Sequence, residues 1–292
     1  MAAEPRDPVA GSKPEPGLYI AATPIGNLGD ITLRALDILR RADVVACEDT
    51  RVTARLLSRH GIETPRISYH EHNAERALPK ILVRLLDGEC VVLVSDAGTP
   101  LISDPGYRLV RAALEAGHAV IPLPGPSAVM AGLVAAGVPT DRFYYGGFLP
   151  PKTGARRRAI TTISGLSATL VFFESPRRLA GLLVDLADIL GTRDACVARE
   201  LTKLYEELRR GRLADLREHY AAAAPPRGEV TVIIGPPDKS ERPVSSDSEI
   251  DALLREALKH QSPSRAAADV AALTGEDRRH IYRRAVALRE NG

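Results

Sequence analysis

The stretch Ser95–Gly106, with the sequence SDAGTPLISDPG, constrains the fold of this chain more than any other. It follows Val91–Val94, a short apolar run that is typical of a strand buried on both faces. Open α/β sheets bind their ligands at the carboxyl ends of such strands. Gly98 and Gly106 allow the backbone to approach a ligand closely, and the carboxylate of Asp96 accepts hydrogen bonds from hydroxyl and amino groups or binds a cation. Taken alone, the stretch is equally compatible with an ordinary corner between a strand and a helix.

The chain before this stretch repeats the order of strand, polar loop and helix. Residues 18–22 form the first predicted strand, and a loop over 23–30 joins it to a helix over 31–41. This order predicts an α/β domain of the kind that binds nucleotides. The loop has the spacing Gly26-x-x-Gly29 and lacks the dinucleotide pattern G-x-G-x-x-G, and no G-x-x-x-x-G-K-S/T pattern occurs in the chain. The sequence therefore argues against a dinucleotide site and against a phosphate-binding loop.

Polar residues also follow the predicted strand over 44–47. The segment Glu48–Arg51 is a candidate site, because it stands at the carboxyl end of that strand. It is also compatible with a helix start that is capped by Thr50. Both interpretations stay open.

Two histidines follow the predicted strand over 66–69. His70 and His72 would share a face of an extended segment, but the spacing supplies no third metal ligand. A solvated corner before a helix over 74–86, with Asn73 as its N-cap, is the favoured interpretation. No metal site is predicted.

The middle of the chain predicts a second α/β domain, joined to the first by a Pro-rich hinge over 122–125. Ser127 is expected to cap a helix over 128–136. Predicted strands over 169–173 and 195–198 end in the polar segments 174–178 and 199–203. The basic stretch 150–158 between the hinge and these strands is expected to be an exposed loop.

The end of the chain predicts three helices in an arrangement like a helix-turn-helix. Thr274 and Asp277 have the spacing of a capping box and would open the third helix. That helix is rich in arginine, so it is either a phosphate-binding helix or a solvated basic face.

Composition narrows the class of protein. The formal net charge of +2 argues neither for nor against a polyanionic partner. Cys47, Cys90 and Cys196 are far apart and match no metal spacing, so we expect buried thiols in a reducing, cytoplasmic setting. No apolar run approaches the roughly 20 residues of a membrane span. We expect a disordered tail over 1–16, α/β domains over 17–123 and 124–236, a linker over 237–248 and a helical domain over 249–292.

A set of motifs, taken in order, resembles one family. They are residues 23–30 (TPIGNLGD), 48–51 (EDTR), 68–73 (SYHEHN), 95–106, 124–128 (PGPSA), 146–150 (GGFLP) and 173–178 (FESPRR). The chain resembles the tetrapyrrole-methylase-like family, in its branch of small-subunit ribosomal RNA (cytidine-2′-O)-methyltransferases. It departs from the corrin and uroporphyrinogen methylases of that family at the first loop, where those have a G-x-G-x-G-D pattern. The resemblance covers about residues 17 to 290.

The resemblance implies two α/β domains of the tetrapyrrole methylase fold with S-adenosylmethionine in the cleft between them, a small C-terminal helical domain and a homodimer. The implied substrate is a cytidine 2′-hydroxyl in the decoding region of 16S ribosomal RNA, as free RNA or in the small ribosomal subunit. The positions that match the family's cofactor contacts are Pro24, Asp96, Ala97, Gly98, Ile102, Ser127, Ala128, Phe173, Glu174, Leu201 and Gly228.

Methyl transfer to a hydroxyl also needs a proton acceptor and groups that hold RNA. His70 is the first candidate for the general base because its ordinary pKa is near neutral pH, and Asp49 and Glu200 follow. The candidates for phosphate contacts are Arg51, Lys152, Arg156, Arg157, Arg158, Arg177, Arg199, Lys203, Arg278, Arg279, Arg283 and Arg284. The alternative functions are a methyltransferase of the same fold that acts on a corrin or a protein side chain, and a non-catalytic RNA-binding factor in ribosome assembly.

Overall fold

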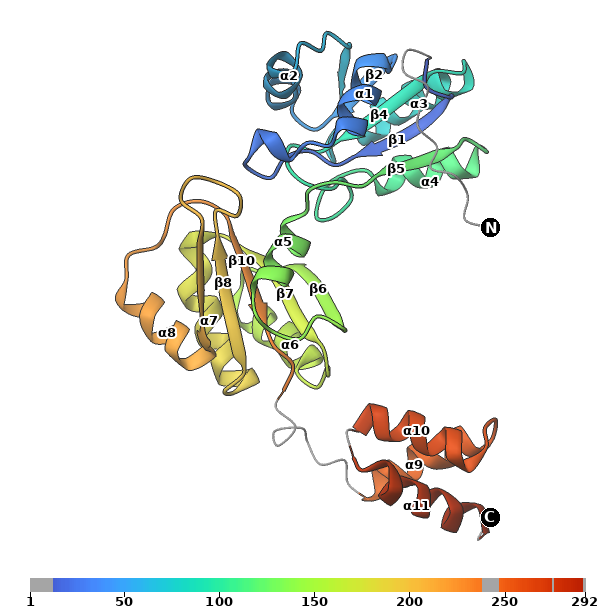
Figure 1. The fold of residues 1–292 in the computed structure, drawn as a ribbon, viewed down its shortest axis with the longest axis vertical. Coiled ribbons are helices and arrows are strands. Elements are labelled where there is room, and N and C mark those ends of the chain that lie inside the picture. The colour runs from blue at the N-terminus through green and yellow to red at the C-terminus, as the bar shows by residue number, and fades with distance from the viewer. Residues whose placement is uncertain (1–12, 238–246, 275, 291–292) are drawn as a thin grey trace. The chain divides into compact units, whose positions relative to one another are not determined.

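The computed structural model describes residues 13–237, 247–274 and 276–290. The predicted tail is therefore outside the described residues up to position 12, and the predicted linker is outside them over 238–246. The chain divides into two compact units, Met1–Ala135 with Ala198–Leu208, and Ala136–Val197 with Arg209–Gly292. Each unit is described separately below (Figure 1).

The first unit is built on a five-stranded sheet with the order β3-β2-β4-β1-β5. Its strands are β1 (Gly17–Ala21), β2 (Val44–Cys47), β3 (Arg66–Ser68), β4 (Cys90–Val94) and β5 (Val120–Leu123). All of its strand pairs are parallel, with Tyr19 opposite Val92 and Val45 opposite Arg66 in the register. The predicted α/β domain is confirmed.

Helices cover both faces of this sheet. They are α1 (Leu33–Arg41), α2 (Thr50–Arg59), α3 (Ala74–Leu86) and α4 (Tyr107–Glu115). The unit also contains a short 3-10 turn η1 (Leu28–Asp30) before α1 and the helix α5 (Ala128–Ala135) after β5. Alternate strand residues point to opposite faces. Val45 and Val92 join one hydrophobic cluster with Leu39 of α1 and Leu57 of α2. Neighbouring strand residues join a second cluster with α3 and α4. The sheet is thus the middle of three layers, and its own edges stay open.

The second unit contains a mixed sheet with the order β6-β7-β10-β8-β9. Its strands are β6 (Phe143–Phe148), β7 (Thr169–Glu174), β8 (Asp194–Arg199), β9 (Glu207–Arg212) and β10 (Val230–Ile234). Its helices are α6 (Thr153–Ile163), α7 (Pro176–Leu190) and α8 (Leu213–Ala222). Leucines of α7 pack with residues of β7, β8 and β10 in one apolar cluster. This confirms the second predicted α/β domain.

The end of the chain folds into α9 (Asp247–Leu258), α10 (Pro263–Thr274) and α11 (Arg278–Glu290), with a small core of their own. The expected helical domain is confirmed, but the expected cap is wrong. Asp277 caps α11, because its Oδ1 accepts hydrogen bonds from the backbone N–H groups of Arg279 (3.0 Å) and His280 (2.9 Å). Thr274 instead ends α10, where its hydroxyl donates to the carbonyl of Val270 at 2.8 Å.

Candidate functional site at the carboxyl edge of the first sheet

The parallel strands of the first unit place all their carboxyl ends on one edge of the sheet. Two of the loops there are joined by backbone hydrogen bonds, from Thr23 N–H to the Gly98 carbonyl (2.9 Å) and from Gly98 N–H to the Thr23 carbonyl (3.0 Å). The hydroxyl of Thr99 donates to the carbonyl of Pro126 at 3.0 Å, which ties in the loop after β5. Predicted cofactor residues 24, 96–98, 102 and 127–128 therefore belong to neighbouring loops of one edge.

Close backbone packing shapes these loops. Gly98 has φ +80°, and Gly125 lies so close to Ala22 that a Cβ atom added at position 125 would be 2.8 Å from the Ala22 Cβ. In the same loop as Gly98, the non-glycine residues Leu101 and Ser103 have φ values of +74° and +65°. Such left-handed backbone costs about 1–3 kcal/mol for each residue and gathers at ligand sites. The loop after β4 is thus held in a fixed, strained shape, while Asp96 and Ile102 in it are exposed.

Acidic groups converge at this edge. Asp96 Oδ1 accepts a hydrogen bond from the backbone N–H of Asp49 at 3.0 Å, which joins the ends of β4 and β2. Burial raises the pKa of Asp104 to about 6, a hydrogen bond with Ser95 opposes the rise, and the charges of Glu48 and Asp96 add to it. Burial and the charge of Asp96 also raise the pKa of Glu48. Glu48 and Asp104 were not predicted as site residues, although they lie in the candidate segments 48–51 and 95–106.

Asp49 starts α2, and the expectation that Thr50 caps this helix is wrong. Asp49 Oδ1 accepts hydrogen bonds from the Arg51 backbone N–H (2.8 Å) and from Arg51 Nε (3.0 Å), and Arg51 Nη2 is 2.6 Å from Asp49 Oδ2. The Arg51 guanidinium holds the pKa of this carboxyl well below its usual range. A carboxylate that is already satisfied in this way is a poor acceptor for a substrate proton, and Arg51 is committed to the same pair.

His70 follows β3 and is fixed through its backbone. Its N–H donates to Asn73 Oδ1 at 2.9 Å, and Asn73 Nδ2 donates to the Ser68 carbonyl (3.0 Å) and hydroxyl (3.2 Å). The Asn73 side chain therefore makes no helix-capping bond, contrary to expectation. Among the described residues the buried His70 Nδ1 has no hydrogen-bond partner, and no three residues form a metal-binding group. His70 thus keeps an unused ring nitrogen at the strand edge.

The segment 198–208 belongs to the same compact unit as this edge. Lys203 lies over Gly26, where an added Cβ atom would be 2.2 Å from Lys203 Cγ, so only glycine fits at position 26. Lys203 Nζ donates to Glu200 Oε1 at 2.8 Å, and Arg199 Nε donates to Glu207 Oε2 at 3.1 Å. Leu201 is buried. Glu200, the third candidate base, is therefore ion-paired.

Phe173, Glu174 and Gly228, the other predicted cofactor residues, lie in the second unit. The Glu174 side chain is fully buried, and its Oε1 accepts hydrogen bonds from Ser175 N–H (2.7 Å) and Arg178 Nε (2.6 Å). Its Oε2 has no partner among the described residues. Gly228 has φ +93°. The Glu174 carboxylate thus pairs with Arg178 through one oxygen and keeps the other oxygen unpartnered.

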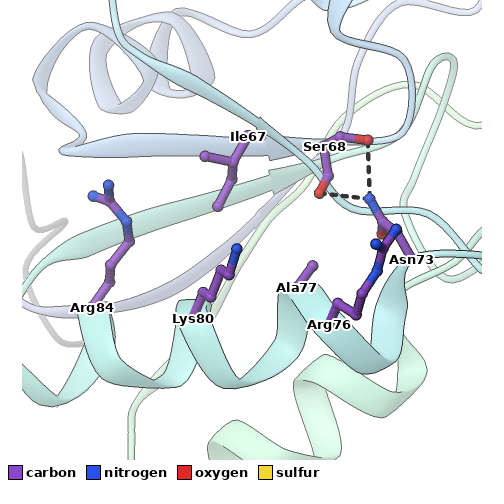
Figure 2. A pocket seen from close by; sticks show the side chains of 7 residues that line it. All are labelled: Ile67, Ser68, Asn73, Arg76, Ala77, Lys80 and Arg84. Carbon is purple, nitrogen blue, oxygen red and sulfur yellow. Dashed lines mark hydrogen bonds between the residues drawn. The ribbon is translucent and has the colours of Figure 1, made fainter.

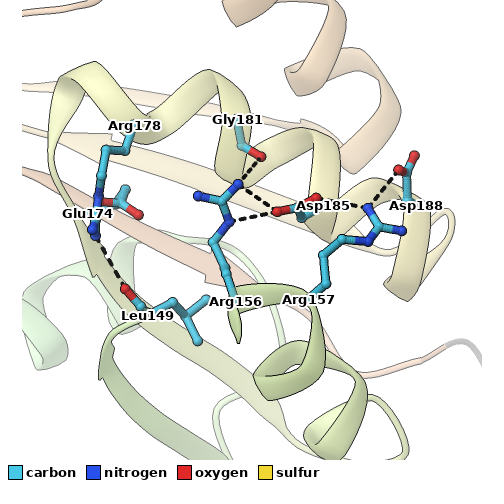
Figure 3. A network of polar contacts seen from close by, with 8 residues as sticks. All are labelled: Leu149, Arg156, Arg157, Glu174, Arg178, Gly181, Asp185 and Asp188. Carbon is cyan, nitrogen blue, oxygen red and sulfur yellow. Dashed lines mark hydrogen bonds and ion pairs between the residues drawn. The ribbon is translucent and has the colours of Figure 1, made fainter. Parts of the chain in front are cut away.

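The basic stretch 150–158 was expected to be an exposed loop, and the structure differs from this. Much of it is the start of helix α6, and Arg156 is only 6% exposed. Its Nε donates to Asp185 Oδ2 at 2.6 Å, while Arg157 Nη1 is 2.8 Å from Asp185 Oδ1 and 3.0 Å from Asp188 Oδ2. Figure 3 shows both arginines pointing from α6 toward the acidic residues of α7. The prediction of an exposed loop is wrong for Arg156 and Arg157, because Asp185 and Asp188 of α7 pair with them. Lys152 and Arg158 are exposed.

The arginines of α11, like the basic residues of 150–158, include both ion-paired and exposed side chains. Arg284 Nε donates to Asp251 Oδ1 of α9 at 3.0 Å, and Arg284 Nη1 is 2.9 Å from Asp247 Oδ1. Arg278, Arg279 and Arg283 are exposed. Arg284 therefore links α11 to α9, and the three exposed arginines remain candidates for phosphate contacts. Arg177 of α7 is also exposed and remains a candidate.

Comparison with known proteins identifies the family. A model of tetrapyrrole (corrin/porphyrin) methylases matches residues 17–217, and a model of the RsmI C-terminal HTH domain matches residues 244–289. Ribosomal RNA small subunit methyltransferase I of Mesorhizobium japonicum is 50% identical over 277 residues, which cover 94% of this chain and 93% of that protein. The protein of the same name from Xylella fastidiosa is 47% identical over 268 residues, covering 91% of this chain and 97% of that protein.

Solved structures have the same fold at lower identity. A cobalt precorrin-4 methyltransferase matches with a TM-score of 0.57 and 19% identity over 75% of this chain and 94% of its own. A uroporphyrin-III C-methyl transferase from Thermus thermophilus, complexed with S-adenyl homocysteine, matches with a TM-score of 0.53 and 21% identity over 75% of this chain and 97% of its own.

The chain belongs to the tetrapyrrole (corrin/porphyrin) methylase family. It is a methyltransferase, and the implied methyl donor is S-adenosylmethionine. No helix in the described ranges is long and apolar enough to span a membrane.

Proposed function

We propose that this chain transfers a methyl group from S-adenosylmethionine to the ribose 2′-hydroxyl of a cytidine in 16S ribosomal RNA. One observation carries the proposal. A model of the RsmI C-terminal HTH domain matches residues 244–289, and the two relatives named above for ribosomal RNA match 94% and 91% of the chain, whereas the corrin and porphyrin methylase structures match 75% of it. The helical domain is thus part of what the chain shares with the ribosomal RNA enzymes.

The edge of the first unit fits the cofactor in its chemistry. S-adenosylmethionine carries no phosphate, which agrees with the absence of a phosphate-binding loop. The exposed carboxylate of Asp96 is suited to the ribose hydroxyls or the amino group of the cofactor, and the buried Gly98 is the proposed backbone contact in the same loop. Ala97, Ile102, Ser127 and Ala128 complete the proposed contacts on this unit, with buried Pro24 and Leu201 behind them. Phe173, Glu174 and Gly228 of the second unit are also proposed cofactor contacts. The unpartnered Oε2 of Glu174 supports this role for Glu174.

The chain's own chemical task is to position the 2′-hydroxyl and remove its proton, because the bound sulfonium supplies an already activated methyl group. Positioning contributes several kcal/mol, and a general base about 10²–10⁴-fold in rate. We assign the base role to His70, because its Nδ1 is unpartnered whereas Asp49 and Glu200 are held in ion pairs with Arg51 and Lys203. Asp49 then serves to fix the start of α2 beside Asp96.

Lys152, Arg158, Arg177 and three arginines of α11 are the proposed phosphate contacts that stay exposed. Arg156 is withdrawn from this role because it is buried. A homodimer and a cytoplasmic location, where small ribosomal subunits are found, belong to the same proposal.

The test is methyl transfer from labelled S-adenosylmethionine to three parallel acceptors: unmodified small ribosomal subunits, naked 16S RNA and soluble cell protein. We expect label in the RNA, in a nucleotide whose 3′-phosphodiester bond resists alkali because the 2′-oxygen is blocked. Label in protein or small molecules alone would exclude the RNA assignment and favour a methyltransferase with another substrate. Cofactor binding and RNA binding without transfer to any acceptor would favour an assembly factor.

A further inference from the structure

The first unit has a basic groove outside the carboxyl edge. It lies between the edge strand β3 and helix α3, and it encloses about 520 Å³. Ile67 and Ser68 form the strand wall, and Arg76, Lys80 and Arg84 stand on the helix. Figure 2 shows the helix side chains rising toward the strand that carries Ile67 and Ser68. None of these residues was among the expected RNA contacts.

The cations of this groove form a row. Arg76, Lys80 and Arg84 are spaced four residues apart, so they share one face and span about 12 Å along the helix axis. Arg84 Nη1 is 2.7 Å from Glu89 Oε2. In the described part of the chain, neither Arg76 nor Lys80 forms an ion pair. Like charges four residues apart destabilise a helix by about 0.2–0.5 kcal/mol, so the neighbouring cations Arg76 and Lys80 are a cost to the fold that an anionic ligand would offset.

The strand wall suits a polar, chain-like ligand. β3 pairs only with β2 and is the edge of its sheet, so one side of its backbone is not used within the sheet. The Ser68 hydroxyl stands at the same wall and is bonded to Asn73. A linear row of cations facing hydroxyl and backbone groups fits a run of phosphodiesters and riboses better than a single compact anion.

The groove also leads to the proposed catalytic residue. Asn73 lines the groove and accepts the hydrogen bond from the His70 N–H at 2.9 Å. The first cation, Arg76, is one helical turn from Asn73. A nucleic-acid strand lying in the groove would therefore pass directly to the carboxyl edge where His70 is fixed.

We propose that the groove between β3 and α3 binds the phosphodiester backbone of the substrate RNA next to the target nucleotide. Arg76 and Lys80 contact the phosphates, and Ser68 and Asn73 contact the sugar-phosphate chain beside His70. This inference rests on the proposed function, because it assumes an RNA substrate. It differs from that function in naming a second, non-catalytic contact surface.

The test is the double variant R76Q/K80Q, compared with R55Q/R59Q as a matched control. Arg55 and Arg59 are exposed, stand on α2 of the same unit at the same spacing, and their loss changes the charge by the same amount. Binding to 16S RNA and to small subunits is measured at several salt concentrations, together with binding of S-adenosylmethionine. The charge-conserving variant R76K/K80R is a third arm.

We expect R76Q/K80Q to weaken RNA binding about tenfold or more at low salt. The magnitude of the slope of log K against log salt should fall by about 1.4–1.8, since each of the two phosphate contacts contributes about 0.7–0.9. Cofactor binding should be unchanged, R76K/K80R should bind nearly as the parent, and R55Q/R59Q should keep the parent slope. Equal losses in both double glutamine variants would overturn the groove assignment while leaving the proposed function intact. A change in oligomeric state without a change in RNA affinity would assign the groove to a second copy of the chain and also overturn it. Failure of the parent chain to bind or methylate RNA is the distinct result that would remove the proposed function itself.

Discussion

Helices α3 and α6 carry similar clusters of basic residues and use them in opposite ways. On α6, Arg156 is buried and paired with Asp185, and Arg157 bridges Asp185 and Asp188 of α7. On α3, Arg76 and Lys80 face a groove and have no ion pair in the described part of the chain. The difference comes from the neighbouring element, because α7 presents acids to α6 whereas the edge strand β3 presents none to α3. A run of basic residues is therefore informative about RNA only once the element that faces it is known.

The largest effect should come from breaking the buried pair. Arg156→Ala leaves the buried Asp185 with only the half-exposed Arg157 as an ion partner, and loss of one partner of a buried pair costs up to about 3–5 kcal/mol. We expect faster hydrogen exchange of the α7 and β7 amides, with the β1 and β4 amides of the other unit unchanged. Replacing both partners by apolar residues, R156M/D185L, is the control, because it removes the pair without leaving a charge. If the single variant exchanges like the parent, the pair is not what holds α6 on α7.

An acidic group at the first sheet's edge should give a smaller effect of opposite sign. The pKa of Asp104 is raised to about 6 in the folded chain and is near 3.9 when unfolded, so the folded state binds the proton more tightly. Stability therefore falls as pH rises from about 4 to 6 and stays lowered above that. Asp104→Asn removes this penalty and should stabilise the first unit at pH 7.5 by about 1–2 kcal/mol, after allowance for solvent screening.

The measurement for Asp104 is hydrogen exchange of the β4 amides at pH 7.5 and 4.5, corrected for the intrinsic exchange rate at each pH. The variant should gain protection at the higher pH and only about a third as much, in free energy, at the lower one, where most of the penalty from Asp104 is absent. An equal gain at both values would mean that titration of Asp104 is not its cause.

The smallest effects should fall on the exposed and half-exposed cations. Arg76→Ala should change the stability of the first unit by no more than about 0.5 kcal/mol, because the side chain is exposed and unpaired.

Arg157→Gln should leave RNA affinity and its salt slope unchanged, because Arg157 is committed to acids of α7. A loss of RNA affinity in Arg157→Gln would erase the contrast between the two helices.

His70 and the cations of the groove between β3 and α3 are proposed to act on different steps. His70→Ala should lower turnover at least tenfold while leaving S-adenosylmethionine and RNA affinities near their parent values. R76Q/K80Q should instead act mainly on RNA affinity. Unchanged turnover in His70→Ala would remove the histidine as the base.

Much of this organisation was predictable from the sequence, because local patterns encode it. The apolar runs that become β1, β2, β4 and β7, and the polar residues that follow them, predicted α/β domains with candidate sites at the carboxyl ends of their strands. The expected buried, free thiols are also found for Cys47, Cys90 and Cys196. The C-terminal helices were also predicted from local patterns, whereas the cofactor came from the family resemblance and not from composition or periodicity.

The wrong and missed predictions have three physical causes. Arg156 and Arg284 pair with acids 29 and 33 residues away in the sequence, and no local pattern connects such partners. The helix caps were misassigned because a neighbouring aspartate accepts the hydrogen bonds of the first backbone N–H groups. Asp49 does so for α2 in place of Thr50, and Asp277 does so for α11 in place of Thr274. The groove was missed because Arg76, Lys80 and Arg84 become a row only when the helix is formed and β3 is seen to be its neighbour.

The most direct test of the central claim is nucleoside analysis of small-subunit RNA after reaction with labelled S-adenosylmethionine, comparing the parent chain with Asp96→Ala. Asp96 is chosen because its exposed carboxylate stands at the centre of the proposed cofactor edge. We predict labelled 2′-O-methylcytidine with the parent chain, and a loss of both product and cofactor binding with the variant. Label on a base or in protein, or full activity of Asp96→Ala, would contradict the account.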